Sequence, residues 1–333
     1  MVALLHQEKL TSFPAGFPLL SGLKLMKYLI TIIGPTAIGK TSLSIALAQH
    51  FKCDIISCDS RQFFKEMTIG TAVPSKEELA SATHHFIQNK SIFEEYSVGD
   101  FEKEAIAKLN ELFQTNDYAI LVGGSGLYVD AILKGFDEFP DIDPSVRSDV
   151  NASYEKLGIG YLQEQLQALD PDYFQKTSLE NPQTLQNPQR MMRFAEVCLG
   201  TGKPYSSFLN QKKNNRNFTP IIIGLEAERS VIYNRINQRV DIMLKEGLLA
   251  EAEKLYPNKE LNALQTVGYR ELFSYFDGDF TLAFAIEEIK KNTRRFSKRQ
   301  LTWFKRTENA KWFDYLTDRK QIIDYIQSKT HNS

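Results

Sequence analysis

One octapeptide, Gly34-Pro35-Thr36-Ala37-Ile38-Gly39-Lys40-Thr41, constrains the fold of this chain more than any other segment. It matches the pattern G-x-x-x-x-G-K-[ST] and lies between a buried-strand pattern at 28–33 and a helical pattern from Thr41 to about His50. In that context the loop N–H groups and the helix N-terminus attract a phosphate, and Lys40 adds a full positive charge. The sequence therefore predicts a phosphate-binding P-loop formed by residues 34–41.

Further strands and helices alternate after this loop. Residues 53–58 form a second apolar run that ends at Asp59, and residues 118–122 form a third that runs into glycines. Between them, Asp100 is the expected N-cap of a helix whose apolar residues recur at helical spacing. Strand–helix alternation of this kind predicts a parallel sheet covered by helices on both faces.

The alternation stops in the middle of the chain. From Asp141 to about Gly202 no strand-like run occurs, whereas Ile221–Ile223 again has the pattern of a strand. The sequence therefore predicts an α/β fold, a P-loop NTPase-like parallel sheet at 26–140 and 204–333, with a mostly helical insertion domain at 141–203. We interpret residues 1–25 as a loosely attached extension, with Met26 as an alternative start of translation.

Cysteine content and hydropathy indicate a cytoplasmic protein. The three cysteines form no C-x-x-C pair, and no apolar run approaches the roughly 20 residues of a membrane-spanning helix. We therefore expect buried thiols in a reducing compartment, without a disulfide, a zinc site or a membrane partner.

Asp59 is the acidic residue that directly follows a predicted strand. Because the carboxyl ends of parallel strands meet at one edge of a sheet, Asp59 should face the phosphates. A carboxylate there can ligate Mg²⁺ or take a proton from an acceptor, although a turn cap explains the spacing equally well. A motor-type ATPase needs an acidic residue after a later strand, but glycines and a serine follow residues 118–122.

A strongly basic segment occupies residues 290–306. It holds eight Lys and Arg residues and no acidic residue, whereas the whole chain has a net charge of −1. On a helix, Arg295, Lys298 and Arg299 lie close together, and Trp303 can stack. Most charge runs are solvated helix faces. Eight unbalanced charges instead favour a polyanion such as RNA as the partner.

Several short motifs accompany the P-loop and the basic segment. In chain order they are Ser57-Cys58-Asp59-Ser60-Arg61-Gln62, Ile69-Gly70-Thr71-Ala72, His84-His85, Tyr96-Ser97-Val98-Gly99-Asp100-Phe101, Gly123-Gly124-Ser125-Gly126-Leu127-Tyr128, Asn187-Pro188-Gln189-Arg190, Val267-Gly268-Tyr269-Arg270 and Lys298-Arg299-Gln300-Leu301-Thr302-Trp303-Phe304. By the number and order of these motifs, the chain from about residue 28 to 315 resembles the bacterial tRNA dimethylallyltransferases.

This resemblance implies a specific reaction. A dimethylallyl group passes from dimethylallyl diphosphate to the exocyclic N6 amine of the adenosine 3′ to the anticodon, and diphosphate leaves. The implied partners are dimethylallyl diphosphate and the anticodon arm of tRNA, and the implied cofactor is Mg²⁺. We expect a monomer, which suits an enzyme that wraps one RNA arm.

The resemblance also assigns residues. It implies that Asp59 is the general base, that Lys40, Thr41 and Arg239 act on the diphosphate bound by residues 34–41, and that Thr41 reaches the diphosphate-bound Mg²⁺. The implied tRNA contacts are Asp59, Ser60, Arg61, Gln62, Ser125, Arg147, Gln189, Arg190, Met191, Met192, Arg193, Arg294, Arg295, Lys298 and Arg299. Ser125 stands where the family most often has Thr, and it keeps the hydroxyl group.

Three alternative functions are compatible with parts of the sequence. A P-loop small-molecule or nucleoside kinase would use the loop and Asp59, but it has no need of the insertion or the basic segment. A regulatory RNA-binding protein would not need a full set of catalytic groups. For prenylation of free adenine nucleotides, the basic segment would be superfluous.

Overall fold

The computed structural model describes residues 26–137, 139–209 and 216–330, so the extension predicted at 1–25 lies outside the described residues. The chain forms a six-stranded sheet in the order β3-β2-β4-β1-β5-β6, and every described pair of strands is parallel. The strands are β1 (Tyr28–Ile33), β2 (Ile55–Ser57), β3 (His84–His85), β4 (Tyr118–Val122), β5 (Thr219–Glu226) and β6 (Lys311–Asp314). The predicted parallel sheet is confirmed.

The strands predicted at 28–33 and 118–122 have the bounds of β1 and β4. The strand predicted at 53–58 is shorter, because the Cys53 N–H donates to Ala48 O (3.1 Å) at the end of the preceding helix. The short strands β3 and β6 form the two edges of the sheet and were not predicted.

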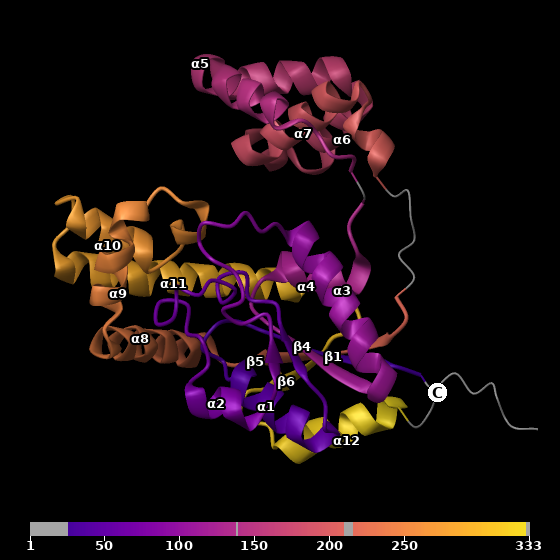
Figure 1. Ribbon diagram of the computed structural model, residues 1–333, viewed down its shortest axis with the longest axis vertical. Coiled ribbons are helices and arrows are strands. Elements are labelled where there is room, and N and C mark those ends of the chain that lie inside the picture. The colour runs from indigo at the N-terminus through magenta and orange to yellow at the C-terminus, as the bar shows by residue number, and fades with distance from the viewer. Residues whose placement is uncertain (1–25, 138, 210–215, 331–333) are drawn as a thin grey trace, which may run out of the picture.

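Helices cover both faces of the sheet (Figure 1). One apolar cluster joins the sheet to α1 (Lys40–Phe51), to the first turns of α8 (Arg229–Glu246) and to α12 (Arg319–Thr330). A second cluster joins it to α3 (Val98–Thr115), α4 (Gly126–Lys134) and the end of α11 (Leu282–Phe304). The phosphate-binding loop thus leaves the middle of a sheet that is buried on both sides.

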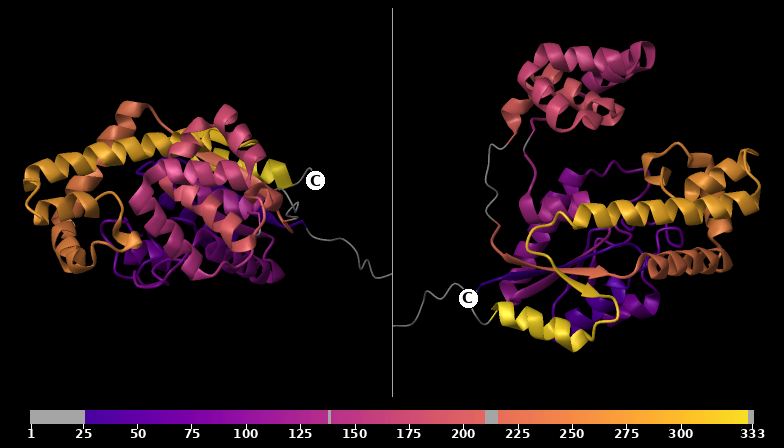
Figure 2. Two further views of the ribbon diagram at one scale, coloured as in Figure 1. Left: turned by 90° about the horizontal axis from the view of Figure 1, so that it is seen from above. Right: turned by 180° about the vertical axis from the view of Figure 1, so that it is seen from behind.

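The helices α8, α9 (Leu248–Leu255), α10 (Tyr269–Phe276) and α11 form a group that extends beyond the sheet (Figure 2). This group has its own apolar cluster, which also includes Phe64, Met67 and Ile92 from the segment between β2 and α3. Because α8 begins three residues after β5 ends, the group starts at the carboxyl edge of the sheet. A further short helix, α2 (Lys76–Ser81), precedes β3.

Residues 144–201 form a separate helical unit, which stands above the sheet in Figures 1 and 2. Its helices are α5 (Pro144–Leu169), α6 (Pro171–Glu180) and α7 (Pro188–Thr201), and α5 is interrupted at Gly158 by a positive φ of 74°. The unit has a core of its own, in which Leu162, Leu166 and Met191 are fully buried. Within the described part of 136–218, no strand is present.

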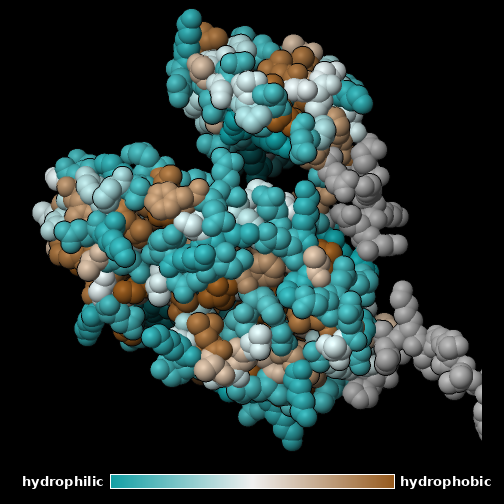
Figure 3. Space-filling view, viewed as in Figure 1, coloured by the Kyte–Doolittle hydropathy of each residue, from teal (hydrophilic) through white to brown (hydrophobic). Residues whose placement is uncertain are grey.

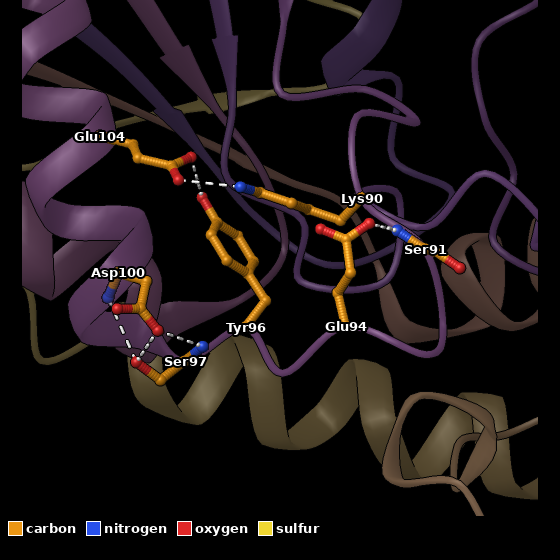
Figure 4. Close-up of polar contacts among 7 residues, drawn as sticks. All are labelled: Lys90, Ser91, Glu94, Tyr96, Ser97, Asp100 and Glu104. Atoms are coloured by element: carbon orange, nitrogen blue, oxygen red, sulfur yellow. Dashed lines mark hydrogen bonds and ion pairs between the residues drawn. The ribbon is translucent and has the colours of Figure 1, made fainter.

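The motif from Tyr96 to Phe101 builds the start of α3 (Figure 4). Ser97, not Asp100, is the N-cap, so the prediction for Asp100 is wrong. Ser97 Oγ accepts from Asp100 N (3.2 Å) and the Asp100 carboxylate accepts from Ser97 N (3.0 Å), which closes a reciprocal capping box. Glu104 then binds both Lys90 Nζ (2.8 Å) and Tyr96 OH (2.9 Å), which fastens the preceding loop to the helix.

Candidate active site

The predicted P-loop connects β1 to α1. Gly34 has a φ of 146°, and a Cβ at this position would lie only 2.7 Å from Leu225 O, so a larger residue would collide with β5. Lys40 Nζ folds back over the loop and donates to Gly34 O (2.9 Å) and Pro35 O (2.8 Å). The Lys40 ammonium group therefore lies within the curve of the loop.

This loop forms one wall of a cavity of about 550 Å³, which we call the phosphate cavity. Residues 36–42 line it, together with Arg235 and Arg239 of α8. Arg235 Nε donates to Ala37 O (2.6 Å), which ties α8 to the loop. Arg239 makes no hydrogen bond or ion pair with any described residue, so its charge is available to an anion in this cavity.

A second cavity of about 570 Å³ adjoins the first, and we call it the helix-side cavity because α11 forms much of its wall. Phe296, Arg299 and Trp303 line it from α11, and Ser60 and Arg61 line it from the turn after β2. The residues that line both cavities are Thr36, Asp59, Thr71, Ala72, Gly124, Arg239 and Met243. The two cavities therefore meet beside Asp59.

Asp59 uses one of its two carboxylate oxygens as a turn cap, and its role as a proton acceptor stays a prediction. Its Oδ1 accepts from Arg61 N (3.1 Å) and so caps the turn, whereas its Oδ2 accepts no hydrogen bond from any described residue. Burial raises the pKa of Asp59 above the usual 3.8, although the Arg61 N–H and the charge of Lys40 oppose this rise. The carboxylate is therefore more basic than a solvated one.

Burial has the opposite effect on the cation beside it. The pKa of Lys40 is lowered from 10.5 to about 8, mainly by burial and in part by the charge of Arg239, while the charge of Asp59 opposes the shift. In the absence of an anion, Lys40 therefore loses its proton just above neutral pH.

Gln300 of α11 bridges the walls of the two cavities. Its Oε1 accepts from Thr36 N (2.8 Å) in the P-loop, and its Nε2 donates to Gly124 O (2.8 Å) after β4. A Cβ on residue 124 would lie 2.4 Å from Gln300 Nε2, so only glycine allows this approach. Sequence reasoning assigned no role to Gln300, although it lies in the motif at 298–304.

Residues 60–62 hold neighbouring loops in place. Ser60 N donates to Ser125 Oγ (3.1 Å), so the Ser125 hydroxyl joins the segments after β2 and β4. Arg61 Nη1 donates to the carbonyls of Asn262 and Ala263 (both 2.9 Å). Gln62 Nε2 donates to Ala72 O (2.9 Å), and Gln62 lines the phosphate cavity, not the helix-side cavity.

The loop that contributes Thr71 and Ala72 to both cavities is anchored by Glu251 of α9. The Glu251 carboxylate accepts from the backbone N–H groups of residues 68, 69 and 70 at 2.8–3.0 Å, and from Tyr269 OH (2.6 Å). Sequence reasoning missed Glu251, because only its position in space relates it to the site.

The eight basic residues of 290–306, six of them in α11 and two directly after it, fall into three groups. Lys290, Lys291 and Lys305 form ion pairs with Asp241, Glu288 and Glu226 respectively. Arg294 binds Asn237 Oδ1 (2.7 Å) on α8. Arg295, Lys298, Arg299 and Arg306 are exposed and form no ion pair with a described residue. The charge that is free to meet an anion is therefore about half of what the sequence suggested.

The predicted tRNA contacts in the helical unit 144–201 do not line either of the two cavities beside Asp59. Gln189, Arg190 and Arg193 line a third cavity of about 630 Å³, and Arg147 binds Glu196 (2.9 Å) and Gln189 (3.3 Å). Met191 and Met192 are 0% and 6% exposed in the core of the unit. These two side chains therefore pack inside the unit, and the prediction that residues 191 and 192 contact RNA stays a prediction.

The donor atoms around the phosphate cavity fit Mg²⁺ only in combination with a ligand. Hydroxyl and carboxylate oxygens of Thr41 and Asp59 are the kind of donor that Mg²⁺ prefers. The described residues contain no group of three or more acidic, His or Cys side chains that could hold a metal ion alone. Mg²⁺ would therefore bind here with phosphate oxygens and water.

Known proteins are similar to this chain in sequence and in fold. The model of the family described as IPP transferase matches residues 62–307. The tRNA dimethylallyltransferase of Flavobacterium johnsoniae is 80% identical over 308 residues, which cover 92% of this chain and 100% of the relative. The enzyme of the same name from Christiangramia forsetii is 61% identical over 302 residues, which cover 91% and 98%.

Solved structures agree with these sequence relatives. A crystal structure of the full-length tRNA isopentenylpyrophosphate transferase of Bacillus halodurans matches with a TM-score of 0.67 at 36% identity, over 92% of this chain and 97% of that one. A eukaryotic dimethylallyltransferase, described as acting on tRNA, matches with a TM-score of 0.77 at 26% identity, over 91% and 80%. No described helix is long and apolar enough to cross a membrane. Because the family model covers most of the chain and the relatives align over almost their whole length, the chain belongs to the IPP transferase family.

Proposed function

We propose that the protein transfers a dimethylallyl group from dimethylallyl diphosphate to the N6 amine of the adenosine 3′ to the anticodon of tRNA. The observation that carries this proposal is the meeting of two cavities beside Asp59. One cavity is lined by a P-loop, which suits a diphosphate. The other is lined by exposed Arg299 and by aromatic residues, which suit a nucleotide base extruded from its stack.

The reaction forms a bond between N6 and the allylic carbon and breaks the bond from that carbon to the diphosphate oxygen. An aromatic amine is a weak nucleophile, so the Asp59 carboxylate takes its proton as the new bond forms. Lys40, Arg239 and the loop N–H groups hold the oxygens of the leaving diphosphate, where negative charge develops. Mg²⁺, when bound, neutralises part of that charge.

The surroundings of the two cavities suit an RNA substrate. Figure 3 shows a hollow between the helical unit and the rest of the protein, and the visible walls of this hollow are mainly hydrophilic. We propose that the anticodon arm enters there, between α11 and the cavity that contains Arg190 and Arg193. We also propose that the protein acts as a cytoplasmic monomer. The kinase alternative is not supported, because the relatives are named as dimethylallyltransferases.

The decisive experiment combines the protein with Mg²⁺, isotope-labelled dimethylallyl diphosphate and unmodified tRNA. We expect label in the RNA at the adenosine 3′ to the anticodon, and none when guanosine replaces that adenosine. Parallel reactions with free adenosine monophosphate and with γ-labelled ATP test the nucleotide-prenylating and kinase alternatives. Transfer of phosphate without transfer of the isoprenoid would contradict the proposal.

The two shifted pKa values predict a bell-shaped pH profile for kcat/KM with respect to dimethylallyl diphosphate. Activity should fall at low pH, because protonation of Asp59 removes the base, and this limb should lie above pH 3.8 because the pKa of Asp59 is raised. It should also fall as the pH rises through about 8, because free Lys40 then loses the charge that binds diphosphate. In Lys40→Arg the alkaline limb should disappear, since arginine keeps its proton. An unchanged alkaline limb would assign it to another group.

The unpaired and the ion-paired basic residues of 290–306 allow a matched test of RNA binding. When Arg295, Lys298 and Arg299 are replaced by Gln, the slope of log K against log salt should fall by roughly 0.7–0.9 for each RNA phosphate that the helix no longer neutralises. When Lys290, Lys291 and Lys305 are replaced instead, the net charge changes equally, but the slope should change little because acidic partners already neutralise them. Equal effects of both triple variants on filter-binding titrations would contradict an RNA contact along this helix.

A further inference from the structure

The place of the isoprenoid follows from the two cavities, and this step rests on the proposed function. The same carbon atom leaves the diphosphate oxygen and receives the amine nitrogen. That carbon must therefore lie where the phosphate cavity and the helix-side cavity meet. The remaining carbons of the donor need an apolar surface close to this junction.

Met243 is the long apolar side chain at this junction. Of the seven residues that line both cavities, Thr36, Asp59, Thr71 and Arg239 are polar, whereas Ala72 and Gly124 are small. Met243 is partly buried and packs against the apolar cluster of α8–α11. That packing holds the methionine at the border of the two cavities.

The spacing on α8 relates Met243 to the diphosphate. Arg239 and Met243 are four residues apart, so they lie on the same face of the helix, one above the other. A rise of 1.5 Å per residue separates them by about 6 Å along the axis, which is the length of about four carbon–carbon bonds. When the diphosphate of the donor lies beside Arg239, a five-carbon isoprenoid reaches Met243. A ten-carbon isoprenoid would have to extend beyond Met243.

We propose that Met243 closes the end of the isoprenoid subsite and so restricts the donor to five-carbon allylic diphosphates. Met243 packs against an apolar cluster that includes Leu248 and Val240, and both of these residues also line the helix-side cavity. Shortening Met243 therefore opens space in an apolar region, where additional carbons of a longer chain are favourable.

The test compares dimethylallyl and geranyl diphosphate as donors to the same unmodified tRNA, with the product identified by mass spectrometry of the nucleosides. In Met243→Ala, the ratio of kcat/KM for geranyl to that for dimethylallyl diphosphate should rise at least about tenfold, as for other hydrophobic size selections. The volume-conserving Met243→Leu should leave the ratio near that of the wild type.

Leu244→Ala is the matched control. Leu244 packs in the same apolar cluster but lines neither cavity, so its truncation should leave the donor ratio unchanged. An equal loss with both donors in Met243→Ala, or an equal rise of the ratio in Leu244→Ala, would overturn the proposal. If Met243→Ala is poorly folded in thermal denaturation, Met243→Val is the milder truncation and should raise the ratio in the same direction. An unchanged ratio in a folded Met243→Val would also overturn it.

Measurements of donor binding distinguish a failure of this inference from a failure of the proposed function. Calorimetry without RNA should show that the wild-type protein binds geranyl diphosphate more weakly than dimethylallyl diphosphate and that Met243→Ala reduces this difference. If the wild type fails to transfer dimethylallyl to tRNA, the proposed function fails. If transfer occurs and Met243→Ala does not alter donor preference, only the role of Met243 fails.

Discussion

Asp59→Asn should lower kcat by about 10²- to 10⁴-fold, which is the usual contribution of a general base, while the affinity for tRNA stays that of the wild type. Asn is preferred to Ala because its side-chain oxygen still accepts from Arg61 N and keeps the turn closed. Single-turnover transfer to labelled tRNA measures the loss, and filter binding measures the affinity. Full turnover in the variant would reduce Asp59 to a turn cap.

A second measurement separates proton transfer from metal binding at Asp59. If Asp59 acts as the base, the Mg²⁺ concentration for half-maximal activity should be the same in wild type and Asp59→Asn. A large increase in that concentration, with recovery of activity at high Mg²⁺, would make the carboxylate a metal ligand. Asp54→Asn is the matched control, because Asp54 precedes the other end of β2, binds His85 and lines neither cavity.

Lys40→Met should be comparably severe, with transfer slowed about 10²- to 10³-fold, as when one donor to a developing anion is removed. The carbonyls of Gly34 and Pro35 hold the ammonium group within the curve of the loop, and methionine supplies neither a charge nor a donor there. Calorimetric titration with inorganic diphosphate should show a matching loss of affinity, since the anion then lacks the ammonium group that lies within the loop.

Lys52→Met provides the control for Lys40. Lys52 directly follows the other end of α1 and is exposed, so its replacement removes the same charge without changing a residue that lines either cavity. Near-normal diphosphate binding in Lys40→Met, or an equal loss in Lys52→Met, would show that the P-loop lysine does not bind the leaving group.

Local patterns in the sequence predicted the elements around the P-loop. β1 and β4 are mainly apolar and largely buried, and the glycines between β1 and α1 are required by the curvature of the loop. The short edge strands β3 and β6 escaped prediction because two to four residues carry too little periodicity. Their pairing depends on neighbours far away in the sequence.

The site was predictable only where one residue type at one position determines the chemistry. Asp59 follows a strand and could be found in this way, whereas Gln300 contacts Thr36 across 264 residues of chain and Met243 matters only through its position between two cavities. For residues 290–306, the sequence instead overestimated the positive charge that is free to bind an anion. The segment is unbalanced along the chain, yet Asp241 and Glu226 neutralise two of its lysines in space.

The hydrogen bond from Thr36 N to Gln300 Oε1 also means that this P-loop depends on α11 for its conformation. One of its backbone donors is already committed to a side chain from the far end of the polypeptide, so the octapeptide grafted into another α/β protein would present an unsatisfied N–H. Conversely, any displacement of α11 by an RNA must either stretch this bond or move the loop with it. The shape of the proposed diphosphate site is therefore determined jointly by the residues of the loop and by the helix for which we propose an RNA contact.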